Sequence, residues 1–400
     1  MNGPFARSLR IHSALLRDAL RPGQALAAPL GVRRASTLAA AVPPYLALQA
    51  CHWLGFGADA LCFRSARQQP LTSPLFVLGI PRSGTTFVHR LLAEDAARFT
   101  TMTTWQAVLA PSISERLLWQ GVGRVDRLAG APMRRLRDAL TRWLAGDFDA
   151  IHEVGLDDAE EDYLALLPFA ACFIMALAFP DTPALWRLAA LDRETDAEER
   201  TSIMQAYRSI LQKHCYASGG QRQLLSKNAA FASWAGALAE AFPDARFIIC
   251  LRDPASALAS QISAIEPGRR LFAVDPERRH LGPRFAERFA GQYRHLEAQL
   301  QAHPERMVAV DQADLRAAPG QTLRSALRAI GFDPSEALAD AFERADAEAA
   351  RGQQSRHVHD VTEADRPDPA LLRDMQDCYQ RMCAQAARPA AAPSSARKVS

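Results

Sequence analysis

The stretch Gly79-Ile80-Pro81-Arg82-Ser83-Gly84-Thr85-Thr86 decides the expected fold. It follows the apolar run 75–78, which is typical of a buried parallel strand. It precedes residues 87–92, where apolar side chains recur at helical spacing. In a strand–turn–helix unit of this kind, backbone N–H groups of the turn and of the helix N-terminus bind an anionic group. We therefore expect a phosphate-binding loop at residues 79–86.

The loop departs at one informative position from the P-loop pattern G-x-x-x-x-G-K-[ST]. Gly79, Gly84 and Thr86 match that pattern, but Thr85 stands where it has lysine. Because that lysine contacts the β- and γ-phosphates of a nucleoside triphosphate, its absence argues against ATP or GTP hydrolysis. Arg82 instead supplies a cation inside the loop. The alternative is a strand-to-helix turn that binds no ligand.

Composition narrows the class of protein. The chain has 400 residues, of which 48% are hydrophobic, and its net charge of +3 leaves no basic footprint for nucleic acid. Only Lys213, Lys227 and Lys398 are lysines, so a lysine is more informative here than an arginine. The seven cysteines are scattered, with no C-x-x-C pair and no metal-ligand spacing. We expect a reducing, cytoplasmic compartment and no metal site.

Strand-like and helix-like segments alternate along the chain, which predicts an α/β fold: a parallel β-sheet flanked by helices, with helix-rich insertions. The expected strands are 75–80, 224–226, 247–251 and 307–310. The expected helices between them include 198–214, 231–242 and 284–301. We divide the chain into a basic and apolar helical region at 1–69, a catalytic domain at 70–383 and a disordered tail at 384–400, which is rich in Ala, Pro and Ser.

The N-terminal region is basic and then uncharged. Residues 1–34 contain six arginines and one acid, Asp18. This fits a transit peptide, a helix on an anionic membrane, or a basic surface helix. Residues 35–58 lack charged side chains but include adjacent prolines, which favours a buried or interfacial helical hairpin over a membrane span. The apolar segment 164–180 is short for a span, and we expect a core helix there.

A second motif follows the expected strand 247–251. Arg252 ends this strand, Pro254 begins a helix, and Ser260 lies eight residues after Arg252 on that helix. A guanidinium and a hydroxyl at the same sheet edge suit a phosphate, because the guanidinium forms a bidentate charged fork. The alternative is a local Arg252–Asp253 ion pair at a helix start.

Two further segments contain candidate residues for proton transfer and for stabilising charge. Lys227 lies at the carboxyl end of an expected strand, where open α/β sheets bind ligands. The acidic segment 147–162 includes His152 and Glu153, and a helix there would place Glu153, Asp157 and Glu160 on one face. The alternative for this segment is an exposed acidic helix.

These motifs together resemble the bacterial-type sulfotransferases that use 3′-phosphoadenosine-5′-phosphosulfate (PAPS), whose fold is P-loop NTPase-like. The resemblance covers most of residues 70–380 and implies that loop 79–86 binds the 5′-phosphosulfate, through Arg82, Ser83, Gly84, Thr85 and Thr86. It implies that Arg252 and Ser260 bind the 3′-phosphate, and that Arg356 lies in the C-terminal nucleotide loop. Two departures from family patterns are Ala229, which replaces a proline after Lys227, and the absence of an Arg-Lys-Gly signature near Arg356.

The resemblance also implies the chemistry. Lys227 and Arg82 stabilise charge on the transferring group, and a base takes a proton from the acceptor, with His152 as first candidate and Glu153 as second. No metal is required, because arginine and lysine replace it. We expect sulfuryl transfer from PAPS to a hydroxyl or amine of a small or lipid-like acceptor, with peripheral membrane contact through the N-terminal region as a further expectation. The alternatives are a P-loop kinase or NTPase, and a non-catalytic membrane-associated protein.

Overall fold

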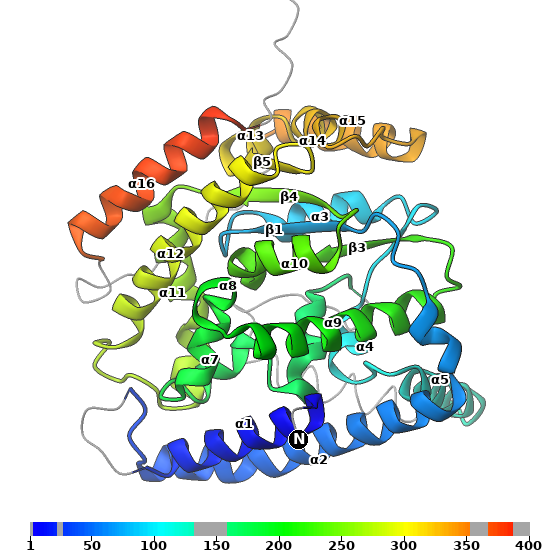
Figure 1. The fold of residues 1–400 in the computed structure, drawn as a ribbon, viewed down its shortest axis with the longest axis vertical. Coiled ribbons are helices and arrows are strands. Elements are labelled where there is room, and N and C mark those ends of the chain that lie inside the picture. Colours follow the sequence, from blue (N-terminus) through cyan, green and yellow to red (C-terminus); the bar gives the residue numbers. More distant parts are fainter. Residues whose placement is uncertain (1–2, 22–26, 132–157, 353–366, 387–400) are drawn as a thin grey trace, which may run out of the picture.

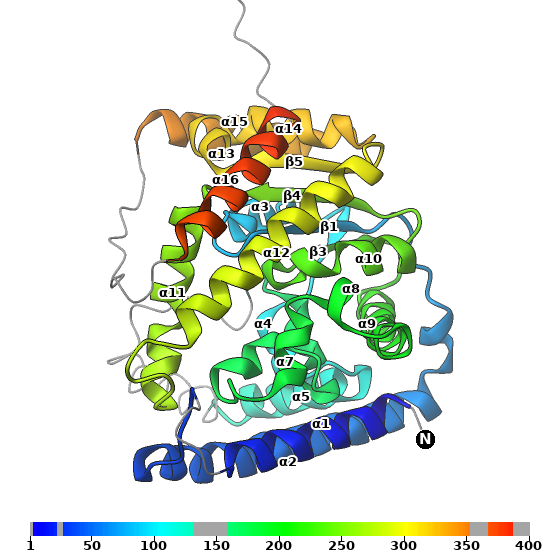
Figure 2. The ribbon, with the colours of Figure 1, turned by 60° about the vertical axis from the view of Figure 1, so that its left-hand side comes forward.

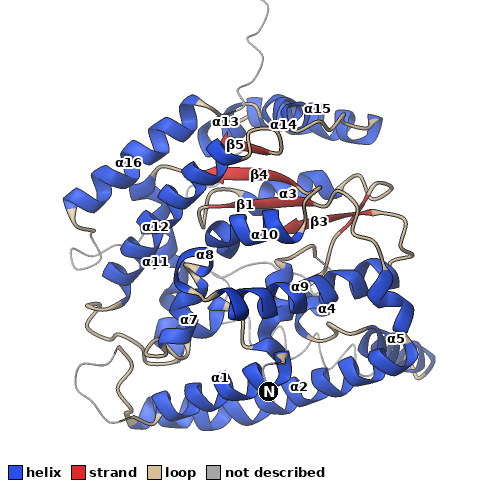
Figure 3. Ribbon diagram, in the orientation of Figure 1, coloured by secondary structure: helices blue, strands red, loops and turns tan. Residues whose placement is uncertain are grey.

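A five-stranded parallel sheet lies between helices, nearer to α14 and α15 than to α1 and α2 (Figures 1 and 3). The computed structural model describes residues 3–21, 27–131, 158–352 and 367–386. The strand order is β2-β3-β1-β4-β5, and every adjacent pair is parallel. The strands are β1 (Leu75–Gly79), β2 (Phe99–Thr100), β3 (Gln223–Lys227), β4 (Arg246–Leu251) and β5 (Met307–Asp311).

Alternate side chains of the strands enter two different cores. On one face, Leu75 and Val77 of β1 pack with α3 (Thr85–Ala93), α14 (Pro319–Ala329) and α15 (Glu336–Ala350). On the other face, Phe76 and Leu78 pack with η4 (Ala229–Trp234), α10 (Ala235–Ala241) and α12 (Leu281–Ala302). The sheet is thus covered by helices on both sides, which explains why its strands are apolar without alternation (Figure 2).

A second, helix-rich layer lies on the α10 side of the sheet, and α1 (Pro4–Ala19) and α2 (Val32–Cys62) lie side by side beyond it (Figures 1 and 2). The α-helices of this layer and its flank are α4 (Thr104–Val108), α5 (Ile113–Leu128), α7 (Pro183–Leu188), α8 (Leu191–Glu194), α9 (Ala197–Ala217) and α11 (Pro254–Leu271). The remaining elements are η1 (Arg64–Gln68), η2 (Asp162–Phe169), η3 (Phe173–Leu177), α13 (Gln312–Ala317) and α16 (Pro369–Ala384).

The α/β fold and its parallel sheet are confirmed. The four expected strands are present as β1, β3, β4 and β5, and the three expected helices correspond to α9, η4 with α10, and α12. Strand β2 was not expected, because two residues, Phe99 and Thr100, are too few to show a strand pattern. The division at residues 69 and 383 stays a prediction, and the expected tail lies outside the described residues from 387 on.

The expected hairpin within residues 35–58 is wrong, because α2 continues through Pro43 and Pro44 as one helix. Prolines ordinarily interrupt a helix by removing hydrogen bonds. Here tertiary contacts on both sides of them hold the helix together: before them, Arg34 Nη2 donates to the Ala178 carbonyl at 2.8 Å. Tyr45 contacts His12 of α1, and Trp53 Nε1 donates to the Pro168 carbonyl at 3.1 Å. Within the described residues, no helix is long and apolar enough to cross a membrane.

The core helix expected over residues 164–180 is also wrong. The segment forms two short 3₁₀ helices, η2 and η3. Pro168 lies inside η2, and Ala170 directly after it has a left-handed backbone with φ of 50°. A continuous apolar run carries no periodicity, so the sequence could not distinguish these turns from a buried α-helix.

Candidate active site

The loop between β1 and α3 is bent sharply at the carboxyl edge of the sheet. Ile80 N–H donates to the Cys250 carbonyl at 3.1 Å, which anchors the loop to β4. Arg82 and Gly84 have left-handed backbones, with φ of 70° and 92°. Helix α3 then starts at Thr85, and the first N–H groups of an α-helix have no acceptor within it. The predicted anion cradle is therefore present in the backbone.

One side chain of this loop has a polar atom that is available to bind a ligand. Ser83 is completely buried, and its Oγ has no hydrogen-bond partner among the described residues. A buried hydroxyl without a partner costs about 1–3 kcal/mol, so such a group is expected to bind something. Thr85 is buried and Thr86 is half-buried in the first turn of α3. The residues predicted to surround an anion thus lie together.

Replacing either of two loop glycines with alanine is predicted to destabilise the protein, by different amounts and for different reasons. At Gly79 an added Cβ would lie 2.2 Å from the Cys250 carbonyl oxygen, so Gly79→Ala should destabilise the protein by about 3 kcal/mol through overpacking. At Gly84 the nearest atom would be Leu315 Cδ1 at 4.0 Å, and the left-handed φ alone should cost about 1–2 kcal/mol. Urea unfolding measures both. Equal losses for the two variants would contradict this assignment.

Arg82, Arg252 and Ser260 form one connected group. Arg82 Nε donates to Ser260 Oγ at 3.3 Å, and Arg252 Nη1 donates to the Arg82 carbonyl at 2.8 Å. Tyr293 OH in turn donates to the Arg252 carbonyl at 2.6 Å, which fixes the backbone after β4. The structure thus brings the first motif and the second motif together, 170 residues apart in sequence.

This group carries concentrated positive charge. Burial lowers the pKa of the Arg252 guanidinium, and the nearby charges of Arg316 and Arg82 lower it further. Arg316 lies on α13, just after β5, and sequence reasoning missed it. Its only signal was its place after a strand, because arginines are abundant throughout this chain. Like charges gathered at one sheet edge indicate a site for a polyanion.

Lys227 reaches the loop from β3. Its side chain is 1% exposed, and its Nζ donates to Thr86 Oγ1 at 3.2 Å. It also contacts Glu160 Oε1 at 3.1 Å and Glu161 Oε1 at 3.2 Å. An ammonium group therefore lies beside the loop that lacks its own lysine at Thr85. This ammonium group comes from β3, the strand next to β1.

The helix expected to carry the acidic segment does not extend to Glu160. Ala159 forms an antiparallel bridge with Thr103, and Glu160 N–H donates to the Met102 carbonyl at 3.1 Å, so this part is extended. The pairing orients Glu160 towards Lys227, which the helical hypothesis did not anticipate. The predicted site residues His152, Glu153 and Arg356 lie outside the described residues.

A buried network behind Lys227 positions the two glutamates. Asp162 Oδ1 accepts hydrogen bonds from Tyr207 OH at 2.7 Å and Asn228 Nδ2 at 2.5 Å. Tyr163 N–H donates to Asn228 Oδ1 at 2.9 Å. These bonds join the backbone that follows Glu161 to the residue that follows Lys227. Burial raises the pKa of Asp162 to about 6.

Asp162→Asn is predicted to remove a pH dependence of stability. The folded-state pKa of about 6 exceeds the unfolded value of about 4, so the folded state binds more protons between these values. Stability of the wild type should therefore fall as pH rises from about 4 to 6 and stay lower above that. The variant should be more stable at pH 8 by about 3 kcal/mol. Unfolding midpoints from pH 4.5 to 8 measure this, and parallel curves for both proteins would contradict it.

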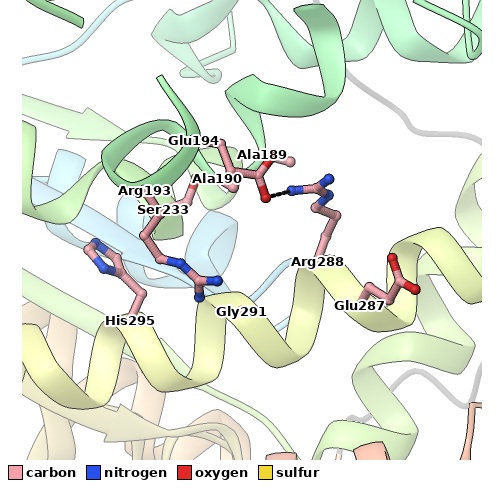
Figure 4. Close-up of a pocket in the computed structure, with 9 residues that line it drawn as sticks. All are labelled: Ala189, Ala190, Arg193, Glu194, Ser233, Glu287, Arg288, Gly291 and His295. Carbon is pink, nitrogen blue, oxygen red and sulfur yellow. Dashed lines mark hydrogen bonds and ion pairs between the residues drawn. The ribbon is translucent and has the colours of Figure 1, made fainter. Parts of the chain in front are cut away.

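Two cavities lie elsewhere. One, of about 30 Å³, is enclosed by α8, η4 and α12 beside His295 and Arg288, and is too small for a nucleotide (Figure 4). The other, of about 370 Å³, lies between α1, α2 and α9 and is lined by aromatic side chains. Among the described residues, no group of three or more His, Cys, Asp or Glu side chains is placed to hold a metal ion.

Comparisons with known proteins bear on the family and the fold. The sequence model of a family described as "Sulfotransferase family" matches residues 74–336. Sulfotransferase STF9 from Mycobacterium avium aligns over 97% of this chain and 98% of its own, with a TM-score of 0.67 and 18% identity. Sulfotransferase STF1 from Mycobacterium tuberculosis H37Rv aligns over 72% and 75%, with a TM-score of 0.54 and 20% identity. None of the curated proteins matches.

Proposed function

Because the chain belongs to the sulfotransferase family, we propose that it transfers a sulfuryl group from PAPS to a hydroxyl or amine of a small or lipid-like acceptor. The loop at residues 79–86 would hold the 5′-phosphosulfate, with Ser83 Oγ as one donor and the N–H groups of α3 as others. Arg252 and Ser260 would hold the 3′-phosphate. Arg316 would add a second cation near Arg252.

The observation that carries the proposal is the contact between the two anion sites. Arg82 belongs to the first site and is bonded through its side chain to Ser260 and through its carbonyl to Arg252. A nucleoside triphosphate has all its phosphates at one end. PAPS has anionic groups at both the 3′ and the 5′ position, so it needs two sites held at a fixed separation. The two sites proposed for this chain are linked through Arg82.

The proposed reaction is an in-line displacement at sulfur. The acceptor oxygen or nitrogen forms a bond to sulfur while the bond between sulfur and the 5′-phosphate oxygen breaks. The electron pair of that bond remains on the departing adenosine 3′,5′-bisphosphate. Lys227 and Arg82 would stabilise this charge, because fixed cations in a partly desolvated site act without reorganising.

The acceptor proton must leave to a base. His152 remains the first proposed base and Glu153 the second, from the segment just before Asp158. Glu160 and Glu161 are the carboxylates that the structure places beside Lys227. Both carboxylates are already engaged in ion pairs with the buried Lys227 ammonium group. We therefore assign them to holding Lys227 and keep proton removal with His152.

Nucleotide binding tests the proposal against the kinase or NTPase alternative. Isothermal titration calorimetry should show that adenosine 3′,5′-bisphosphate binds without a metal and more tightly than ATP with Mg²⁺. The reverse preference would contradict the proposal, since a triphosphate site would then be the better description.

Transfer of radiolabelled sulfate from PAPS tests catalysis. Lipid alcohols, phenols, amines and carbohydrates should be assayed in parallel with the full-length chain. Transfer to any one class supports an enzyme and identifies its acceptor. Tight binding of the bisphosphate with no transfer to any class would favour the non-catalytic alternative.

A further inference from the structure

Helices α1 and α2 form an antiparallel pair with one face turned to solvent. Phe5 packs edge-on against Trp53, with ring centroids 4.9 Å apart, and His12 Nε2 lies 2.9 Å from Tyr45 OH. On its inner side α1 is tied down by Arg7, which bonds the Phe169 carbonyl and Glu199. The pair lies at the end of the molecule opposite α14 and α15 (Figures 1 and 2).

The solvent side of α1 is apolar along one stripe. Phe5, Leu9, Leu16 and Leu20 are 56%, 60%, 36% and 66% exposed. At 3.6 residues per turn these positions share one narrow face. On the inner side of α1, Ile11 and Leu15 are buried, so this helix is apolar on two sides. An ordinary surface helix packs its apolar side inward and is polar outside.

The solvent side of α2 is uncharged over most of its length. The helix has 31 residues and is about 46 Å long. Val32, Leu54 and Leu61 are 89%, 74% and 71% exposed, and no charged residue occurs from 35 to 58. We define the platform face as the exposed apolar residues of both helices: Phe5, Leu9, Leu16, Leu20, Val32, Leu54 and Leu61.

Arginines border the platform face, and α1 and α2 themselves carry no exposed acid. Arg10, Arg17, Arg21 and Arg33 are exposed. The two acids of α1 and α2 bind residues of the helical layer beneath them. Asp18 accepts from Thr182 Oγ1 at 3.1 Å, and the buried Asp59 accepts from the Ile113 and Ser114 N–H groups and pairs with Lys213. The face therefore combines exposed apolar area with a border of exposed arginines.

We propose that the platform face binds the surface of a bilayer that contains anionic lipids. An in-plane pair of helices with leucine and phenylalanine on one stripe and arginine on the next is the form that suits the boundary between headgroups and acyl chains. Anionic headgroups complement the arginines, whereas an acidic protein surface would leave the apolar stripe unused. The inference concerns a different face from the loop at 79–86 and does not depend on sulfuryl transfer.

A recess adds depth to this face. The cavity of about 370 Å³ opens beside Phe5, where α1 begins, and is lined by Trp53, Phe56, Phe63 and Phe169. Most of the lining is aromatic or aliphatic, which suits the end of an acyl chain, and Asp59, Arg67 and Lys213 line part of the remainder. Lipids of the bilayer would thus contact both the apolar stripe and this pocket.

Co-sedimentation with vesicles tests the proposal on the full-length chain. Vesicles of phosphatidylcholine and phosphatidylserine at 3:1 should pellet the protein, and pure phosphatidylcholine should bind far less of it. Binding should weaken as salt rises from 50 to 500 mM. Equal binding to both vesicle types, or none to the anionic ones, would overturn the proposal.

Matched variants separate the platform face from overall charge. R10Q/R17Q/R21Q should lower affinity for anionic vesicles on the order of 100-fold. R328Q/R351Q/R373Q removes the same charge from exposed positions on or beside α14, α15 and α16 and should have little effect. L9Q/L20Q should weaken binding without altering the thermal midpoint, because both side chains are already exposed. Equal losses in the two arginine variants would overturn the assignment to this face.

Native thiols report which face is covered. Cys51 and Cys62 of α2 are exposed, and the other cysteines are buried or half-buried. Anionic vesicles should protect both from a membrane-impermeant maleimide. Full reactivity on the vesicle would contradict the proposal. Protection in vesicle-free solution, together with a dimeric mass by light scattering, would instead assign this face to a second copy of the chain.

Discussion

Replacing Lys227 with methionine is expected to lower the rate of sulfuryl transfer at least about 100-fold, the range seen when one charge-stabilising group is removed. The ammonium group lies beside Thr86 of the phosphate loop, where charge on the departing 5′-phosphate would develop. Methionine retains the apolar stem but supplies no cation. Single-turnover rates with saturating PAPS measure the effect on the chemical step.

The same change is expected to destabilise the fold, because it leaves Glu160 and Glu161 without their shared cation. Breaking a buried ion pair from one side costs about 3 kcal/mol. A triple variant, K227M/E160Q/E161Q, removes the stranded charges and should recover most of the stability. It should not recover transfer. If the triple variant transfers sulfate at the wild-type rate, then Lys227 is structural.

Lys213 offers a matched control elsewhere in the fold. Its side chain is 13% exposed and pairs with Asp59 at 3.3 Å, among α2, α5 and α9. Lys213→Met should therefore cost stability, as Lys227→Met does, while leaving the transfer rate per folded molecule unchanged. Loss of transfer in both variants to the same extent would show that the assay reports folding alone.

The loop at residues 79–86 and the positions of Arg252 and Ser260 could be predicted because their signal is local. Each sits where a strand ends and a helix begins, and parallel strands bring such ends to one edge. The contacts between Arg82, Ser260 and Arg252 then follow from the order of the strands, since β1 and β4 are neighbours. The placement of these residues at one edge could be predicted without knowing the rest of the fold.

The contacts around Lys227 could not be predicted from the sequence in this way. Glu160 reaches it through an extended segment paired with Thr103, and the Asp162–Asn228 bond closes the arrangement. Both contacts join segments more than 50 residues apart and have no spacing that a sequence shows. Arg316 was hidden for another reason, because an arginine-rich composition masks any single arginine. The continuous α2 was missed because local proline rules were overridden by packing.

Arg252→Gln is expected to weaken binding of adenosine 3′,5′-bisphosphate about 100-fold, since a charge-assisted bidentate contact to phosphate contributes about 3 kcal/mol. Adenosine 5′-monophosphate lacks the 3′-phosphate, and its affinity should change by less than about threefold if the loss is confined to the 3′-phosphate contact. Isothermal titration of both nucleotides measures the difference. Arg252→Lys should be intermediate, because an ammonium keeps the charge but not the planar fork.

The monophosphate also distinguishes the two roles of Arg252, whose Nη1 supports the Arg82 carbonyl. If support of the loop were its main role, both nucleotides would lose affinity equally, and the 3′-phosphate assignment would fail. Arg316→Gln should weaken the bisphosphate by only about tenfold, because Arg316 is exposed and its charge is screened. Arg328→Gln, an exposed arginine on α14, should change neither nucleotide's affinity. A loss confined to the bisphosphate, graded from Arg252 to Arg316 and absent at Arg328, is what a site for PAPS requires.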